Sequence, residues 1–326
     1  MKKLLLFVGV ALFATGSLAG AQEVRSELAD YIPDISLDMR GSYRIDSEYE
    51  SGRFTGDDFY LDINGYISPN FSYSFNHRIA STYYGKASGF DATNWLTLTY
   101  ETDNFAITAG KDALLMGSFE YDAYDLDAYF EMNSPFYNDF DCWQWGASAA
   151  WYPADDHELI FQVAKSPVAA ESMEQVSLAL AWRGTWDCYE SYWTANMWQY
   201  DTKAFTKAFN SGNRFTFGGL VIDLDLMFRF NHPEEENWGF TGIFAPSYTF
   251  GEWGRIFTKA GWDKETDNCF FGGGFEYFPL KDNKDIRFHI AYTHNDYTIG
   301  DMVSLGLTWK MNLTGNIKKL FGATED

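Results

Sequence analysis

Basic side chains recur at alternate positions of strand-length segments, with apolar side chains between them. Within residues 33–46, Ile35 and Leu37 stand at odd positions, whereas Arg40 and Arg44 stand at even positions. Because a strand directs successive side chains to opposite faces, such a segment has an apolar face and a charged face. Guanidinium and ammonium groups gathered on one face attract anions and set the electric field of the space that they surround.

Eight arginines and two lysines share this polar phase. They are Arg40, Arg44, Arg78, Arg183, Arg214, Arg229, Arg255, Lys259, Arg287 and Lys310. In most of these segments the apolar neighbours define the phase independently, but Arg255 and Lys259 are assigned to it partly because they are charged. A charge on a lipid-facing strand costs about 2–4 kcal/mol near the middle of a bilayer. If the sheet closes in a membrane, we therefore expect these ten side chains to line its interior.

Acidic side chains accompany the basic ones. The acidic residues in the same polar phase include Asp38, Asp62, Glu101, Asp225 and Glu276. The segment 112–141 has no strand pattern and is long for a simple connection, which suggests a functional role. The acidic residues that we expect at a constriction are Glu120, Asp122, Asp125, Asp127 and Glu131. We hypothesise that this segment folds back against the basic wall, where opposed charges would sort solutes; the alternative is a solvated acidic surface loop.

Residues that could carry covalent chemistry do not form a recognisable constellation. The chain has five histidines, but no serine in a Gly-x-Ser-x-Gly elbow and no His-Glu-x-x-His pair. Cys142, Cys188 and Cys269 match no zinc or redox spacing, and their disulfide state stays open. We therefore predict that the protein is not an enzyme and needs no cofactor or metal.

The alternation continues along the chain and predicts about sixteen antiparallel strands. They are 33–46, 57–67, 70–80, 93–101, 104–111, 142–152, 157–165, 175–183, 189–199, 213–222, 224–230, 239–249, 253–263, 268–278, 285–294 and 301–313. The weakest boundary is the split near Asp223, where one long strand could replace two. Short turns alternate with the longer connections 47–56, 81–92, 112–141, 166–174, 200–212 and 231–238. An even strand number puts both chain ends on the short-turn side.

The chain begins with the pattern of a secretory signal peptide. Lys2 and Lys3 precede an apolar segment, and Ala19-Gly20-Ala21 provides a small-residue cleavage site. We predict a signal peptide over 1–21, one barrel domain over 22–313 and a short periplasmic tail over 314–326. Loss of residues 1–21 removes two lysines and no acid, so the net charge changes from −22 to −24. Such a charge argues against nucleic acid as a partner.

The aromatic content supports a membrane location. Phe, Trp and Tyr make up 19% of the chain, and aromatic girdles at the two interfaces of a transmembrane barrel would account for this proportion. No later segment has the roughly 18 uninterrupted apolar residues that a spanning helix needs. A membrane-embedded form must therefore be an all-β transmembrane barrel.

Two hairpins resemble the phosphate-selective porin O and P family of Gram-negative outer membranes. The motifs are Phe59 to Ile67, Ser68-Pro69-Asn70, Phe71-Ser72-Tyr73-Ser74-Phe75, Leu96-Thr97-Leu98-Thr99-Tyr100 and Phe105-Ala106-Ile107-Thr108-Ala109-Gly110-Lys111. The likeness is clearest over about residues 55–115. It implies a sixteen-stranded diffusion channel that is often a homotrimer.

These observations predict an outer-membrane porin through which small hydrophilic solutes or ions diffuse passively. Outer-membrane lipid is the expected surrounding partner. The identity of the solute and the preference for anions or cations stay open, because the charges of the wall and of segment 112–141 oppose each other. An outer-membrane barrel acting as an adhesin or structural protein is the first alternative, and a secreted soluble all-β binding module is the second.

Overall fold

The structure is a computed structural model of the 326-residue chain. It describes residues 31–47, 49–81, 89–123, 127, 129, 132–168, 175–231, 238–281, 283–298 and 300–315. The predicted signal peptide lies outside the described residues, as does the predicted tail beyond residue 315.

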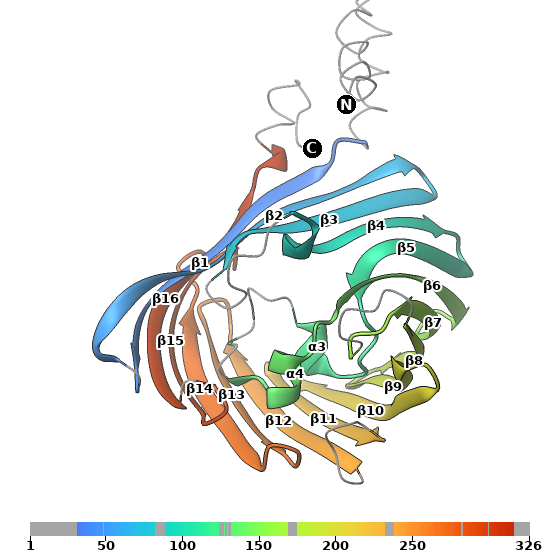
Figure 1. The fold of residues 1–326 in the computed structure, drawn as a ribbon. Coiled ribbons are helices and arrows are strands. Elements are labelled where there is room, and N and C mark those ends of the chain that lie inside the picture. Colours follow the sequence, from blue (N-terminus) through green and yellow to red (C-terminus); the bar gives the residue numbers. More distant parts are fainter. Residues whose placement is uncertain are drawn as a thin grey trace, which may run out of the picture.

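Sixteen antiparallel strands form one closed barrel, which confirms the predicted fold class (Figure 1). The strands are β1 (Asp34–Asp46), β2 (Tyr49–Ser68), β3 (Phe71–Ser81), β4 (Thr93–Glu101), β5 (Phe105–Ala113), β6 (Trp143–Ala154), β7 (His157–Lys165), β8 (Val176–Trp186), β9 (Tyr189–Asp201), β10 (Ala204–Phe217), β11 (Leu220–Phe230), β12 (Trp238–Phe250), β13 (Gly254–Asp263), β14 (Asn268–Tyr277), β15 (Ile286–Asn295) and β16 (Gly300–Asn312). Each strand pairs with its neighbours in sequence, and β1 pairs with β16 to close the barrel. Closure leaves no unpaired sheet edge.

The connections contain three short helices among the described residues. They are η1 (Gly89–Ala92), α3 (Phe119–Asp122) and α4 (Pro135–Asp139). No helix among the described residues is long and apolar enough to cross a membrane. Figure 1 shows α3 and α4, which belong to the connection between β5 and β6, inside the ring of strands.

The seam between β1 and β16 brings the two described chain ends together at one end of the barrel (Figure 1). Thr314 joins them, because its hydroxyl accepts a hydrogen bond from the Ile35 N–H at 2.7 Å and donates one to the Pro33 carbonyl at 3.3 Å. The Leu313 N–H also donates to the Ile35 carbonyl at 2.8 Å. The predicted even strand number and the common side of the chain ends are therefore confirmed.

Three predicted boundaries were wrong. The turn between β10 and β11 lies at Gly218 and Gly219, so Asp223 is in the interior of β11. Gly218 has a φ of 60°, a conformation that suits glycine. The predicted connections 47–56 and 200–212 are short turns, because β2 already begins at Tyr49 and β10 at Ala204. The start of β2 is mostly polar and lacks the alternation, whereas in β10 the exposed Lys207 interrupts the alternation between Phe205 and Phe209.

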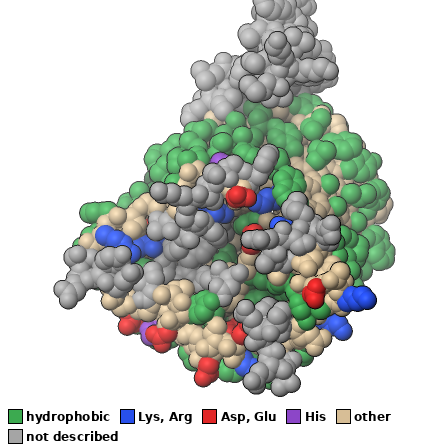
Figure 2. Space-filling model, in the orientation of Figure 1, with side chains coloured by type: hydrophobic (Ala, Val, Ile, Leu, Met, Phe, Trp, Pro, Cys, Tyr) green, Lys and Arg blue, Asp and Glu red, His purple; other side chains and the backbone are tan. Residues whose placement is uncertain are grey.

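The alternation along each strand separates an exposed apolar face from an enclosed polar one. In β1, Asp38, Arg40 and Arg44 are buried, whereas Ile45 is exposed. Exposed apolar residues encircle the barrel on its outer face and form what we call the apolar belt: Leu96, Leu98, Ile107, Phe161, Leu180, Phe209, Phe244, Ile256, Ile290 and Leu305. In Figure 2 hydrophobic side chains cover the upper and right flank of the molecule, whereas charged side chains gather toward the middle and lower rim.

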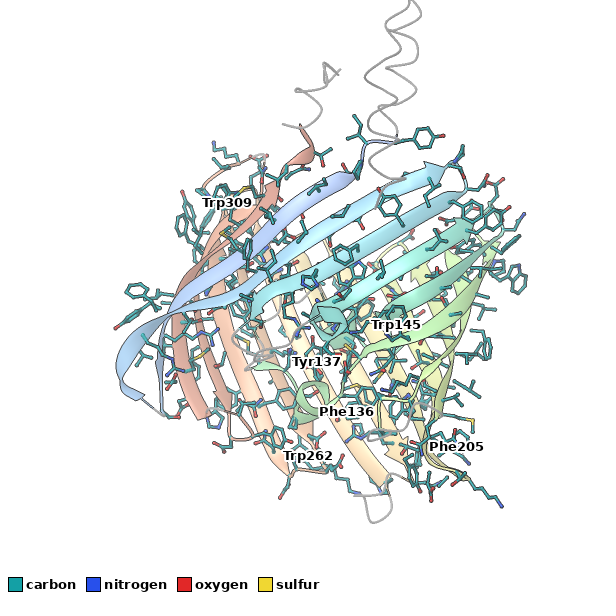
Figure 3. The ribbon with its side chains drawn as sticks, turned by 45° about the horizontal axis from the view of Figure 1, so that its top comes forward. Phe136, Tyr137, Trp145, Phe205, Trp262 and Trp309 are labelled. Carbon is teal, nitrogen blue, oxygen red and sulfur yellow. The ribbon has the colours of Figure 1, made fainter. Side chains whose placement is uncertain are left out.

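Aromatic side chains cluster on the outer face near both ends of the strands. At the end that carries the chain termini, the Trp182 ring centroid lies 5.6 Å from that of Trp186 and 5.3 Å from that of Trp193. At the opposite end, the Phe240 centroid lies 6.1 Å from that of Trp262. Figure 3 shows Trp262, Trp309 and Phe205 at the periphery of the barrel, and Phe136 and Tyr137 within it.

The connection between β5 and β6 builds a hydrophobic core inside the barrel. Leu114, Met116, Phe136 and Phe140 pack against inward-facing wall residues. These wall residues are Ala164, Trp198, Ala208, Met227, Ile243 and Phe270, from β7, β9, β10, β11, β12 and β14. Burying each large apolar side chain contributes about 1.5–3 kcal/mol. These described parts of the connection are therefore packed against the inner wall and do not extend away from it as a solvated surface loop.

Candidate functional site

All ten predicted basic side chains belong to strands. Arg40 and Arg44 come from β1, Arg78 from β3, Arg183 from β8, Arg214 from β10, Arg229 from β11, Arg255 and Lys259 from β13, Arg287 from β15 and Lys310 from β16. Seven of them contact the described part of the connection between β5 and β6 through ion pairs or ring contacts: Arg40, Arg183, Arg214, Arg229, Lys259, Arg287 and Lys310. Because that connection lies inside the barrel, these side chains face the interior.

Glu120 is more enclosed than Asp122 and Asp127, the other two acidic residues of this connection that pair with the wall. Its carboxylate lies 2.5 Å from the Lys259 ammonium and accepts hydrogen bonds from the Ser134 N–H at 2.9 Å and the Ser134 hydroxyl at 2.6 Å. Lys259 also donates to the Asn133 side chain at 2.6 Å. The contacts join α3, the start of α4 and β13 into one buried unit. Removal of one partner of such a buried ion pair strongly destabilises the folded protein, because the other charge is left buried without compensation.

Asp127 bridges two basic residues at the seam side of the barrel. Its carboxylate accepts from the Lys310 ammonium at 2.9 Å and forms an ion pair with Arg287. Burial by itself raises the pKa of Asp127, but the charges of Arg287 and Lys310 together outweigh burial and lower it to about 2. The Asp127 carboxylate is therefore negatively charged throughout the physiological pH range.

Asp122 pairs with Arg183 on the opposite side. The Arg183 guanidinium donates to both carboxylate oxygens, at 2.6 and 3.3 Å. It also stacks over the Tyr192 ring at 3.8 Å from the centroid. Three of the five predicted acidic residues thus contact wall residues, whereas Asp125 and Glu131 lie outside the described residues.

Asp225 anchors the start of α3, a role that the sequence did not reveal. Its carboxylate accepts from the Ser118 hydroxyl at 2.8 Å, the Phe119 N–H at 3.1 Å and the Glu120 N–H at 3.0 Å. It therefore takes up backbone donors that a helix start leaves unsatisfied. The alternation of apolar and polar residues predicts that Asp225 points inward. Its hydrogen-bond donors depend on how the connection between β5 and β6 folds, which the alternation does not predict.

Further anchors hold the rest of the connection to the wall. The Asn210 amide donates to the Met116 carbonyl at 2.6 Å, and the Asn295 amide donates to the Asn133 carbonyl at 2.9 Å. The Tyr129 hydroxyl donates to the Glu276 carboxylate at 3.1 Å. Burial and that carboxylate raise the pKa of Tyr129, so the phenol stays protonated and remains a donor.

Much of the basic charge is also balanced within the wall. The ion pairs of the wall include Arg44 with Asp57 at 2.8 Å, Arg214 with Asp223 at 2.6 Å, Arg229 with Asp263 at 3.3 Å and Arg255 with Glu276 at 3.1 Å. Arg78 donates to the Asn94 side chain at 2.5 Å. The wall is of mixed sign, as its sequence predicts.

No reactive centre emerges from the described residues. No disulfide bond joins Cys142, Cys188 and Cys269 in the structure, and Cys188 and Cys269 are exposed. Among the described residues no group of three His, Cys, Asp or Glu side chains could hold a metal ion. His289 is buried against the edge of the Tyr129 ring, with 5.3 Å between the centroids, so it is part of the packed interior.

Two cavities flank α3 inside the barrel. One, of about 500 Å³, lies between the connection and the wall from β9 to β13, and its lining includes Arg214, Arg255 and Lys259. The other, of about 370 Å³, lies between α3 and the wall from β3 to β6, and its lining includes Trp95, Asp112 and Asp122. Cavities thus lie on both sides of α3, and only the first has basic side chains in its described lining.

Several solved porins share this architecture. A triple mutant of Rhodobacter blastica porin aligns with a TM-score of 0.61 at 11% identity, covering 86% of this chain and 100% of that chain. A double mutant of the same porin aligns with a TM-score of 0.58 at 12% identity, over the same shares. The Vibrio cholerae outer-membrane protein OmpT aligns with a TM-score of 0.57 at 10% identity, covering 85% of this chain and 98% of that chain.

The protein is therefore a porin-like barrel in its fold, and identities of 10–12% establish the fold alone. No family model and no curated protein matches the chain. The resemblance to the phosphate-selective porin O and P family remains a prediction.

Proposed function

We propose that the protein is an outer-membrane porin, a passive channel for small hydrophilic solutes or ions. This proposal rests on the distribution of the side chains, which is the reverse of that in a soluble protein. Charged residues such as Arg40 and Arg229 are enclosed, whereas large apolar residues such as Leu180 and Ile290 are exposed. Barrels of sixteen to eighteen strands are wide enough to leave an aqueous channel.

The apolar belt supports a lipid environment. Single exposed apolar side chains are ordinary on a soluble protein, but contiguous patches larger than a few hundred Å² mark sites of association. The belt continues around strands from β4 to β16, and aromatic clusters such as that of Trp182 and Trp186 lie near its margins. Aromatic rings are enriched at this level in transmembrane barrels because each has an apolar body and a polar edge.

The proposed location is the bacterial outer membrane. It is supported by the signal-peptide pattern of residues 1–21 and by the chain ends, which meet at the end of the barrel that has the short turns. In outer-membrane barrels that end faces the periplasm. Residues 22–313 are then the barrel domain and residues 314–326 a periplasmic tail.

A charge placed in the apolar belt tests the lipid environment. Leu180 is 56% exposed, and Leu180→Arg is expected to destabilise the barrel folded in lipid vesicles by about 2–4 kcal/mol. Ile67 is similarly exposed, at 62%, and lies on the outer face of β2 next to the strand end, so Ile67→Arg is a matched control with an expected cost of about 0–1 kcal/mol. Equilibrium unfolding in denaturant measures both. Equal effects of the two substitutions would argue for a water-soluble barrel.

The connection between β5 and β6 is proposed as the constriction of the channel. Its helices lie inside the barrel, and it presents Glu120, Asp122 and Asp127 to basic wall residues. Opposed charges at a narrow point order water and distinguish solutes by charge and dipole. The low pKa of Asp127 supports a constriction that keeps its shape over the physiological pH range.

Acid is expected to release the Asp127 bridge only near pH 2. A carboxyl with a depressed pKa in the folded state contributes stability above its unfolded value, near 3.8, and loses it as the pH falls through about 2. Wild type and Asp127→Asn should therefore differ in single-channel conductance by a constant amount between pH 7 and pH 4. The two should converge near pH 2. Convergence already at pH 5 would contradict the bridge.

Reconstitution in planar bilayers decides between the candidate functions. Stepwise ionic currents in potassium chloride are expected for a porin, whereas a folded but silent barrel would favour a surface adhesin or structural protein. Cell fractionation tests the remaining alternative, because recovery in the soluble periplasm without detergent would favour a secreted binding module.

A homotrimer is proposed as the assembly. The Vibrio cholerae OmpT structure is described as a trimer form, and the resemblance over residues 55–115 implies a family whose members are often trimers. Light scattering in detergent is expected to give three times the mass of the mature chain.

A phosphate-selective channel of the porin O and P family would also show phosphate currents that exceed chloride currents. Reversal potentials across salt gradients measure this preference.

A further inference from the structure

The cavity between α3 and the wall from β3 to β6 has an aromatic and acidic lining. Its aromatic residues are Trp95, Trp143 and Tyr121, and its acidic residues are Asp112 and Asp122. Among the lining residues that the structure describes, none is basic. The lining of the cavity on the other side of α3 has mixed charge, because it contains two arginines and a lysine beside five acidic residues. The sides of the proposed constriction therefore present different chemistry to a passing solute.

The aromatic groups of this cavity are held in place by neighbours. The centroids of Trp95 and Trp143 lie 5.3 Å apart with their planes at 41°. The Trp95 Nε1–H donates to the Ser74 hydroxyl at 2.6 Å, which fixes that indole. The Tyr121 ring packs 4.7 Å from Tyr137, centroid to centroid. A rigid aromatic surface costs little entropy when a solute binds to it.

The two carboxylates of the cavity differ in their partners. Asp122 is already neutralised by Arg183 at 2.6 Å. Asp112 accepts a hydrogen bond from the N–H of Ala113 at 2.8 Å, which is an uncharged donor. The cavity thus combines two indole rings with a carboxylate whose negative charge is not offset by that contact.

We propose that this cavity binds a small organic cation with apolar substituents on its nitrogen, such as a quaternary ammonium, as the cation passes through the channel. The proposal deepens the porin function and rests on it. A cation over an indole face gains about 0.5–2 kcal/mol from the ring quadrupole, and tryptophan provides the strongest such site. Asp112 adds attraction of the right sign. An inorganic cation keeps its hydration shell and gains less from the rings, while an anion meets the carboxylate and is repelled.

Current interruption by phenyltrimethylammonium tests the site. In planar bilayers the compound is expected to interrupt the potassium current of the wild type. Asp112→Asn and Trp143→Leu should each raise the half-blocking concentration by about fivefold or more, given the strength of cation–π contacts. Trp151→Leu is the matched control, because Trp151 is exposed on the outer face of β6, the strand that also carries Trp143. It should leave the half-blocking concentration unchanged.

Two results would overturn the proposal while leaving the porin function intact. The first is an unchanged half-blocking concentration in both variants, with normal potassium conductance. The second is interruption by glucose or maltotriose, lost in the same variants, without interruption by phenyltrimethylammonium. If the barrel carries no current, the porin function itself fails. Calorimetric titration of the detergent-solubilised protein with phenyltrimethylammonium then still decides the site, since binding that Asp112→Asn does not weaken refutes it.

Discussion

Deletion of residues 118–135 is expected to raise the single-channel conductance roughly twofold or more, because conductance follows the narrowest part of a pore. The deletion removes α3 together with Glu120, Asp122 and Asp127, and hence the contacts with Lys259, Arg183 and Lys310. It should also reduce ion selectivity, since the opposed charges are lost. Bilayer recordings of the wild type and the deletion variant measure both changes.

The control for this deletion is the integrity of the barrel. Inward-facing Tyr192, Phe257 and Ala291 lose apolar partners when the segment is removed, because Phe119, Tyr129 and Met132 are deleted with it, so the variant must be shown to be folded. Circular dichroism and resistance to unfolding in detergent provide that evidence. A folded variant with wild-type conductance would mean that the segment does not limit the flow of ions.

Asp225→Ala is expected to release the start of α3 from the wall. The substitution leaves the Ser118 hydroxyl and the N–H groups of Phe119 and Glu120 without their buried acceptor. Each unsatisfied buried donor costs about 1–3 kcal/mol, so the loss is large enough to populate a detached segment. Open-channel current should become noisy, and added protease should cleave the connection between β5 and β6.

Asp223→Ala is the matched control for this variant. Asp223 lies two residues away on the same inward face of β11, but its ion pair is with Arg214 and not with α3. Quiet current and protease resistance are expected for it. Equal noise in both variants would show that loss of a wall charge, and not loss of the helix anchor, causes the fluctuation.

The fold was predictable because successive residues of each strand face different surroundings, and apolar and polar residues alternate accordingly. The period of two in β1 and β16 marks both faces, and their registered pairing joins like faces across the seam. The signal fails where the alternation is weak, which is why the starts of β2 and β10 were missed: the start of β2 is mostly polar, and Lys207 interrupts the outward apolar face of β10 between Phe205 and Phe209. It also fails at the turn of Gly218 and Gly219, where apolar residues continue on both sides.

The site was predictable only in part. The inward phase of Arg183 and Lys259 follows from their own strands, but their partners Asp122 and Glu120 depend on how a long connection packs. Cross-strand pairs such as Arg214 with Asp223 depend on register, which a turn shifted by a few residues changes completely. The inward position of Trp198 could not be predicted from its own strand. It is an apolar residue in the polar phase, and only the hydrophobic core formed with the connection explains it.

The anchors of the connection between β5 and β6 have a consequence for how the chain assembles. Nearly all of them come from later strands: Arg183 of β8, Asn210 of β10, Asp225 of β11, Lys259 of β13 and Asn295 of β15. Lys310 of β16 is the last. We infer that the segment gathers its attachments one hairpin at a time during biogenesis, serving as an internal template around which the growing sheet curls. Pairing of β1 with β16 would then coincide with the attachment of the segment to Lys310.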